Sequence, residues 1–66
     1  MTTKEVIQLH IRSLQREIDD LEQTKVAMVN ETAREAIDLQ IENLRREIRR
    51  LENENASNEN RKLSNH

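Results

Sequence analysis

Side chains that could carry out chemistry are few in this 66-residue chain, and they are scattered along it. The two histidines, His10 and His66, stand far apart, and there is no cysteine to act as a nucleophile or a metal ligand. A lone imidazole is most often a polar surface group, so we expect no metal site. A carboxylate pair such as Glu17 with Asp20 would need a desolvated pocket before it could serve in acid–base catalysis. These residues predict a protein that is not an enzyme and holds no cofactor.

Four arginines form the densest cluster of functional groups. Their spacing, i, i+1, i+4 and i+5, places them on one strip of a helix: Arg45, Arg46, Arg49 and Arg50. Guanidinium groups bind phosphates and carboxylates in a fork geometry, so the strip could contact RNA or an acidic protein. Glutamates lie among these arginines and no aromatic residue is available to stack on a base, so nucleic acid is not favoured. An ordinary solvated helix face with i to i+4 ion pairs also fits the pattern.

The elements that must position these groups are indicated by a sequence repeat. Residues 2–23 and 32–53 match at 11 of 22 aligned positions, mainly the apolar positions and those that start a helix. Each segment opens with a threonine followed three residues later by a glutamate, at Thr2 and Thr32, which is the pattern of a helix-capping box. The chain has no glycine and no proline, which favours helices joined by a short polar connection.

Alternating spacings of four and three residues separate the apolar positions of both segments, as in the heptad seam of a coiled coil. A single helix through both segments would turn the second apolar stripe about 120° away from the first. A break near Asn30, with this residue in the left-handed conformation and Thr32 capping the next helix, instead lets the two stripes pair. Ten residues are expected in the core seam: Ile7, Ile11, Leu14, Ile18, Leu21, Ile37, Ile41, Leu44, Ile48 and Leu51.

The predicted fold is therefore all-α. It is an antiparallel helical hairpin, a two-helix coiled coil, with helices at about residues 3–29 and 33–54 within a hairpin domain of residues 1–53. Residues 54–66 are rich in asparagine, serine and charge, and we expect them to form a disordered polar tail. Only 33% of the residues are apolar and none is aromatic, so one hairpin has a small core. Two hairpins are expected to associate as a homodimeric four-helix bundle.

Two leucines of the repeated segments lie outside the predicted seam. Leu9 and Leu39 occupy heptad position f, on the far side of each helix from its apolar stripe. Single exposed leucines are common on protein surfaces, but their recurrence in both segments favours an interface with a partner. Where the first segment has Asp19 and Asp20, the second has arginines. This reversal fits complementary pairing between helices or between subunits, and it also fits a surface under no constraint.

The function that these features favour is a small regulatory or adaptor protein that binds another protein, and can inhibit it, through its helix faces. Leu9 and Leu39 would supply apolar anchors, and the arginines would orient the partner. One alternative is an RNA-binding four-helix bundle that uses the arginine strip. The other is a purely structural coiled-coil element whose only partner is itself. No apolar run reaches membrane-spanning length and no signal-peptide core follows Met1, so we expect a cytoplasmic protein.

Overall fold

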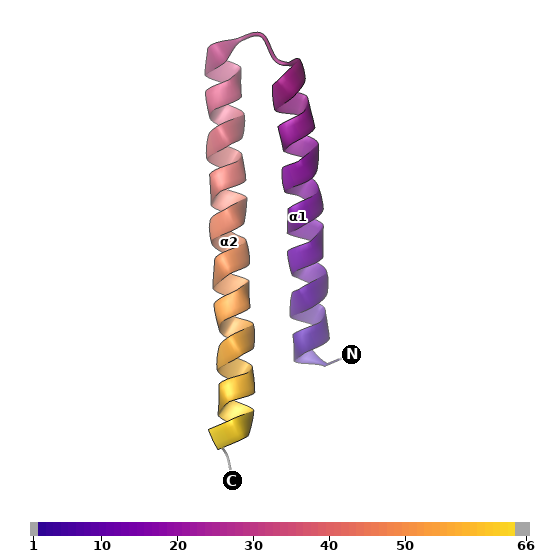
Figure 1. Cartoon of the computed structure of the whole chain (residues 1–66), viewed down its shortest axis with the longest axis vertical. Helices are drawn as coiled ribbons and strands as arrows, with labels where there is room; N and C mark the ends of the chain where they lie inside the picture. The colour runs from indigo at the N-terminus through magenta and orange to yellow at the C-terminus, as the bar shows by residue number, and fades with distance from the viewer. Residues whose placement is uncertain (1, 65–66) are drawn as a thin grey trace.

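The chain folds into two long α-helices that run side by side in opposite directions (Figure 1). The computed structural model describes the backbone of residues 2–64 and the side chains of residues 2–57. Helix α1 spans Thr3–Ala27 and helix α2 spans Glu31–Ser64. The predicted all-α antiparallel hairpin is confirmed. The molecule is elongated and thin, with Cα extents of 57 × 19 × 10 Å.

The start of α1 is capped by the residue that the sequence predicts. Thr2 has an extended backbone, with φ −77° and ψ 160°, and its hydroxyl oxygen accepts a hydrogen bond from the Glu5 backbone N–H at 3.2 Å. The same hydroxyl donates to Oε1 of Glu5 at 3.1 Å. The Glu5 carboxylate therefore accepts its hydrogen bond from the Thr2 hydroxyl. In the usual capping box the glutamate accepts from the backbone N–H of the cap residue.

The turn between the helices differs from the prediction in its backbone conformation. Helix α1 ends at Ala27, and Met28 leaves it in an extended conformation with φ −85° and ψ 131°. The Met28 backbone N–H donates to the Lys25 carbonyl oxygen at 3.1 Å, which satisfies one of the carbonyl groups at the helix end. Among the described residues none has a positive φ, so the expected left-handed conformation of Asn30 is wrong.

The cap of α2 also lies two residues earlier than expected. The Asn30 side-chain Oδ1 accepts from the Ala33 backbone N–H at 3.0 Å, so Asn30 is the N-cap and Thr32 lies within the first turn of the helix. Asparagine is at least as good an N-cap as threonine, so the first suitable residue after Val29 starts the helix. The connection, Met28 to Asn30, keeps the predicted length of three residues and lies two positions earlier, because α1 also ends at Ala27 and not at residue 29.

At its C-terminal end α2 continues past residue 54, where the prediction ends it. The segment that we expected to be disordered has a helical backbone as far as Ser64, and in Figure 1 it projects past the N-terminal end of α1. Neither glycine nor proline interrupts it, and extending a formed helix costs far less than starting one. Asn55 is half-buried and shares a groove with Gln8 and Ile11, so the extension begins against α1. Residues 65–66, and the side chains from residue 58 onwards, lie outside the described residues.

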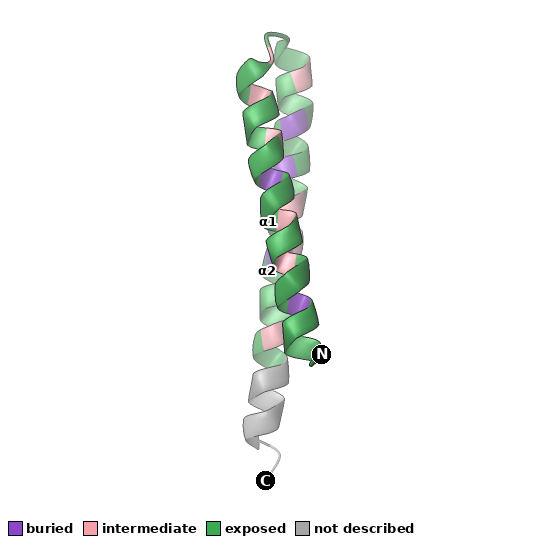
Figure 2. Cartoon of the chain, turned by 90° about the vertical axis from the view of Figure 1, so that its right-hand side faces the viewer, coloured by how far each residue is buried: buried purple, intermediate pink, exposed green. Residues whose placement is uncertain are grey.

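The core is a single line of aliphatic side chains between the two helices, and Figure 2 shows its buried positions spaced along both. All ten predicted seam residues are buried or half-buried. Six are buried: Ile7, Ile18, Ile37, Ile41, Ile48 and Leu51. Four are half-buried: Ile11, Leu14, Leu21 and Leu44. Met28, which the seam prediction omits, packs against this core from the turn. Each buried isoleucine contributes roughly 1.5–3 kcal/mol to folding.

Two ion pairs join the helices across one flank of the core. Glu22 Oε1 accepts from Arg45 Nη2 at 2.9 Å, and these two residues directly follow the seam residues Leu21 and Leu44. Lys25 Nζ lies 2.5 Å from Oδ1 of Asp38. Lys25 occupies a seam position, so its aliphatic stem lies along the core while its ammonium reaches the carboxylate at the surface.

Candidate functional site

The hairpin encloses no pocket among its described residues. Its smallest dimension is 10 Å, about the diameter of one helix with its side chains, and its hollows are shallow grooves open to solvent. Within residues 2–57, no group of three or more histidine, aspartate or glutamate side chains is placed to hold a metal ion. His10 is exposed, and His66 lies outside the described residues. The candidate site is therefore a surface.

Leu9 and Leu39, the leucines of the repeated segments that lie outside the seam, are both exposed. The exposed fraction is 46% for Leu9 and 59% for Leu39. Position f of a heptad points away from the seam of its own helix, and the two seams face each other. Leu9 and Leu39 therefore lie on opposite long edges of the hairpin. The structure does not bring them together into one apolar patch.

Each exposed leucine has an arginine one heptad further along its own helix. Arg16 follows Leu9 on α1, and Arg46 follows Leu39 on α2. Seven residues of helix separate the members of each pair by about 10.5 Å along the axis. We call Leu9 with Arg16 the α1 edge, and Leu39 with Arg46 the α2 edge. Val6, which is 52% exposed, lies one turn before Leu9 and enlarges the apolar part of the α1 edge.

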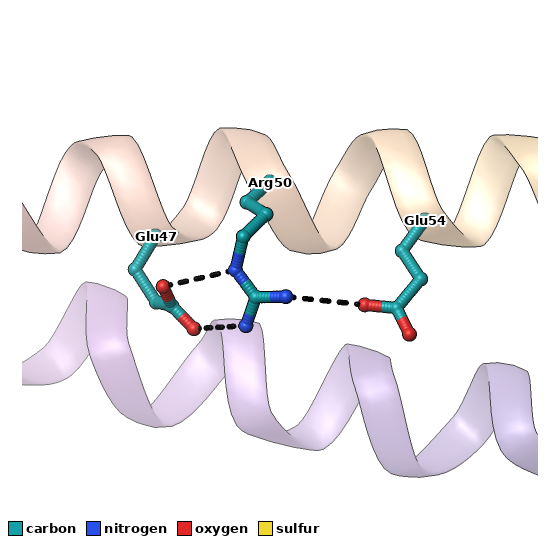
Figure 3. Close-up of polar contacts among 3 residues, drawn as sticks. All are labelled: Glu47, Arg50 and Glu54. Carbon is teal, nitrogen blue, oxygen red and sulfur yellow. Dashed lines mark hydrogen bonds and ion pairs between the residues drawn. The ribbon is translucent and has the colours of Figure 1, made fainter.

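Of the four arginines in the predicted strip, two form ion pairs with carboxylates of the described residues and two do not. Arg45 is used in the ion pair with Glu22, and Arg50 lies between Glu47 and Glu54 on its own helix (Figure 3). The Nε and Nη2 groups of Arg50 donate to the Glu47 carboxylate at 3.1 and 2.5 Å, and its Nη1 lies 3.6 Å from Oε2 of Glu54. The remaining pair, Arg46 and Arg49, has no carboxylate within ion-pair distance in the part of the chain that the structure describes.

The contact between Arg50 and Glu47 also changes their proton affinities. The hydrogen bond from Arg50 lowers the pKa of Glu47 below its ordinary value of 4.5, with a weaker contribution from the positive charge itself. The same hydrogen bond raises the pKa of Arg50. Both side chains therefore remain charged at neutral pH, and Arg50 is held to its own helix surface.

The acidic residues in the middle of α1, which are Glu17, Asp19, Asp20 and Glu22, make fewer contacts with α2 than the charge reversal suggests. Within residues 2–57, only Glu22 of this group forms an ion pair with an arginine of α2. Asp19 and Asp20 have no cationic partner among the described residues, although α2 carries arginines at the matching positions. Pairing between the helices of one chain is therefore not what these two aspartates do.

Sequence reasoning missed a groove of about 390 Å³ that runs between the helices on one face of the hairpin. Its floor is formed by edges of two core isoleucines and its α1 wall is acidic, while its α2 wall carries two arginines and one glutamate. We call it the charged groove. The residues that line it are Gln15, Ile18, Asp19, Glu22, Arg45, Ile48, Arg49 and Glu52. Asp19 and Arg49 both directly follow a seam isoleucine, and this shared heptad position is the signal that could have located the groove.

Comparisons with protein-family models, curated proteins and solved structures found no match to this chain. In the described part of the chain, neither helix is long and apolar enough to cross a membrane.

Proposed function

We propose that this chain is a non-enzymatic protein-binding module, a regulator or adaptor of the cytoplasm, that docks through its two outer edges. The observation that carries the proposal is the repetition of one surface pattern. An exposed leucine is followed one heptad later by an arginine on each edge of the hairpin, at Leu9 with Arg16 and at Leu39 with Arg46. All four residues occupy matched positions of the two sequence segments.

The chemistry of an edge indicates what it would bind. A leucine that is half exposed on a rigid helix is an apolar anchor for a pocket or for another helix. An arginine about 10.5 Å away along the same edge would pair with a carboxylate and so set the direction of the partner. The favoured partner is therefore a protein surface, most simply an amphipathic helix, that carries an apolar position and an acidic residue about two turns apart.

Because the edges face opposite ways, the hairpin would present two docking sites to separate molecules or to separate parts of one molecule. The paired seams of a two-helix coiled coil would hold these sites at a constant separation. Binding at two sites raises the effective concentration at the second site once the first is occupied. Such a module would bridge two copies of one partner, or would cover one partner that itself has two matching sites.

RNA binding by the arginine strip is a weaker alternative. Arg45 and Arg50 are already paired with carboxylates, so the strip offers two unpaired guanidinium groups, Arg46 and Arg49. A ligand that depends on phosphate contacts loses affinity steeply as salt rises, in proportion to the number of phosphates neutralised. Docking on the leucine edges should respond much less to salt.

The proposal is tested by capture of partners from the host cell with the full chain and with edge variants. Leu9→Asp and Leu39→Asp each remove one anchor, and either should reduce the captured protein at least tenfold, since a buried anchor is worth about 2 kcal/mol or more. His10→Asp and Gln40→Asp introduce the same charge at exposed, matched positions about 100° around each helix from the leucine, and they should leave capture unchanged. Circular dichroism checks that helicity is preserved.

Loss of capture in the His10→Asp and Gln40→Asp variants, or no loss in the leucine variants, would contradict edge docking. Captured nucleic acid that is released by salt and by Arg46→Glu would support the RNA alternative instead. If the chain captures only itself, it is a structural assembly element.

A further inference from the structure

We infer that the charged groove is the surface on which a second copy of this chain docks, in a two-fold dimer whose symmetry axis runs along the length of the hairpin. The groove and the leucine edges lie on different sides of each helix. The inference therefore goes beyond the proposed function, and either one can fail without the other.

The charges of the groove are divided unequally between the helices. The α1 wall carries two acids, Asp19 and Glu22, and the α2 wall carries Arg45 and Arg49 together with one acid, Glu52. Glu22 and Arg45 satisfy each other within the chain at 2.9 Å. Asp19 and Arg49 do not, because neither has an oppositely charged partner among the described residues. Among the described residues, two unpaired acids, Asp19 and Glu52, and one unpaired base, Arg49, thus face the same open groove.

A two-fold rotation about the long axis makes these leftover charges complementary. The rotation lays α1 of one copy over α2 of the other. It does not move any residue along the axis, so the two grooves face each other at the same height. Asp19 of each copy then meets Arg49 of the other, and two equivalent intermolecular ion pairs form. An isologous interface of this kind needs one self-complementary patch, which the groove supplies.

The charge pattern also selects this orientation over its main competitor. A two-fold axis running across the hairpin would stack α2 on α2 and point the two turns in opposite directions. Arg45 and Arg49 of one copy would then face the same arginines of the other, and like charges brought together at an interface oppose binding. The favoured dimer therefore has both turns at the same end.

The opposite face of the hairpin has no comparable pattern. Its unpaired acids among the described residues are Glu17 and Asp20, but the arginine that matches Asp20, Arg50, is already held by Glu47 and Glu54 (Figure 3). That face therefore has acids without an available base among the described residues. Asp20 is consequently a matched control for Asp19.

This dimer would bury little additional apolar surface, so its stability should depend strongly on salt and on protein concentration. Ile18 and Ile48 on the groove floor are only 7% and 8% exposed in the single hairpin. The attraction is therefore mainly between partly solvated charges, which salt screens. The dimer should form at high protein concentration and low ionic strength, and dissociate as salt is added.

Sedimentation velocity tests the interface, with the full chain at concentrations up to about 1 mM in low salt. Wild type should show a mass that rises with concentration towards a dimer. Asp19→Arg and Arg49→Asp should each abolish this rise, because each places like charges at the contact. The double variant, which exchanges the two charges, should restore it. Asp20→Arg should associate like wild type, and circular dichroism should show equal helicity in all variants.

Orientation is tested with a spin label on Val29→Cys, at the turn, since the described chain has no cysteine. With both turns at the same end, the label-to-label distance should be comparable to the 19 Å width of the hairpin. With the turns pointing in opposite directions it should exceed about 30 Å, because Val29 lies ten residues, about 15 Å, from Asp19 along the hairpin. A monomer at every concentration would overturn the inference. So would a double variant that does not recover, an equal effect of Asp20→Arg, or a label-to-label distance above about 30 Å. Leu9→Asp should leave the dimer intact, which separates this result from failure of the proposed function.

Discussion

At the scale of single residues, the hairpin shows how neighbouring charges compete for one another. Arg50 could reach across to α1 or remain on α2, and two glutamates on α2, one turn before it and one turn after it, hold it there. The Glu47 carboxylate accepts two hydrogen bonds from Arg50 in a fork geometry, which suits a guanidinium group better than a single carboxylate oxygen would. This local contact removes one arginine from the surface available to a partner.

The pairing of Glu47 predicts a measurable pH effect. Since its pKa is lowered, the ion pair stabilises the fold above the ordinary carboxyl pKa of 4.5, and the contribution is lost as pH falls through the lowered value. NMR titration of the Glu47 side-chain carboxyl should show its pKa rising towards 4.5 in Arg50→Gln. Arg46→Gln should leave it unchanged, and an equal rise in both variants would show that the cause is general charge and not the hydrogen bond.

At the scale of elements, helix ends are determined by competition between nearby capping residues. Asn30 and Thr32 are both suitable N-caps, and the structure uses the earlier one, so that α2 gains part of a turn. At the other end of α2 the sequence has no glycine or proline to end the helix, and the helix continues to Ser64.

Replacing Asn30 or Thr32 by alanine tests which of the two residues caps α2. Asn30→Ala should lower the free energy of unfolding by about 1 kcal/mol, because the Ala33 backbone N–H loses its acceptor. Thr32→Ala should change it by less than about 0.5 kcal/mol, since Thr32 is exposed within the first turn. Urea denaturation followed by circular dichroism measures both, and a larger effect of Thr32→Ala would place the cap where the sequence alone suggested.

At the scale of the whole molecule, the two helices depend on one shared core. Every apolar cluster that the described residues form draws on both α1 and α2, and neither helix has another element to pack against. Most of the stability of a helix in a protein comes from tertiary packing of its apolar face, so each helix should be stable only while the other is in place. We expect one cooperative unfolding transition.

A core substitution tests this cooperativity. Ile41 is 5% exposed and belongs to the central cluster, so Ile41→Ala should lower the free energy of unfolding by about 2–5 kcal/mol. Helicity of α1 and α2 should be lost together, as seen from hydrogen exchange of amides in both helices. Leu39→Ala, two residues away and 59% exposed, is the matched control and should have an effect below about 0.5 kcal/mol. Loss of α2 alone would contradict a shared core.

The sequence by itself determined the hairpin, the ten seam residues and the Thr2 cap. The alternating spacing of isoleucine and leucine is a local periodic signal, and a cap depends on residues only a few positions apart. The tertiary structure decided which charges meet, because ion pairing depends on the residues that face each other across the two helices and on competing partners within one helix. It therefore placed Leu9 and Leu39 on opposite edges, paired Arg45 with Glu22, and left Asp19 and Arg49 facing the same groove.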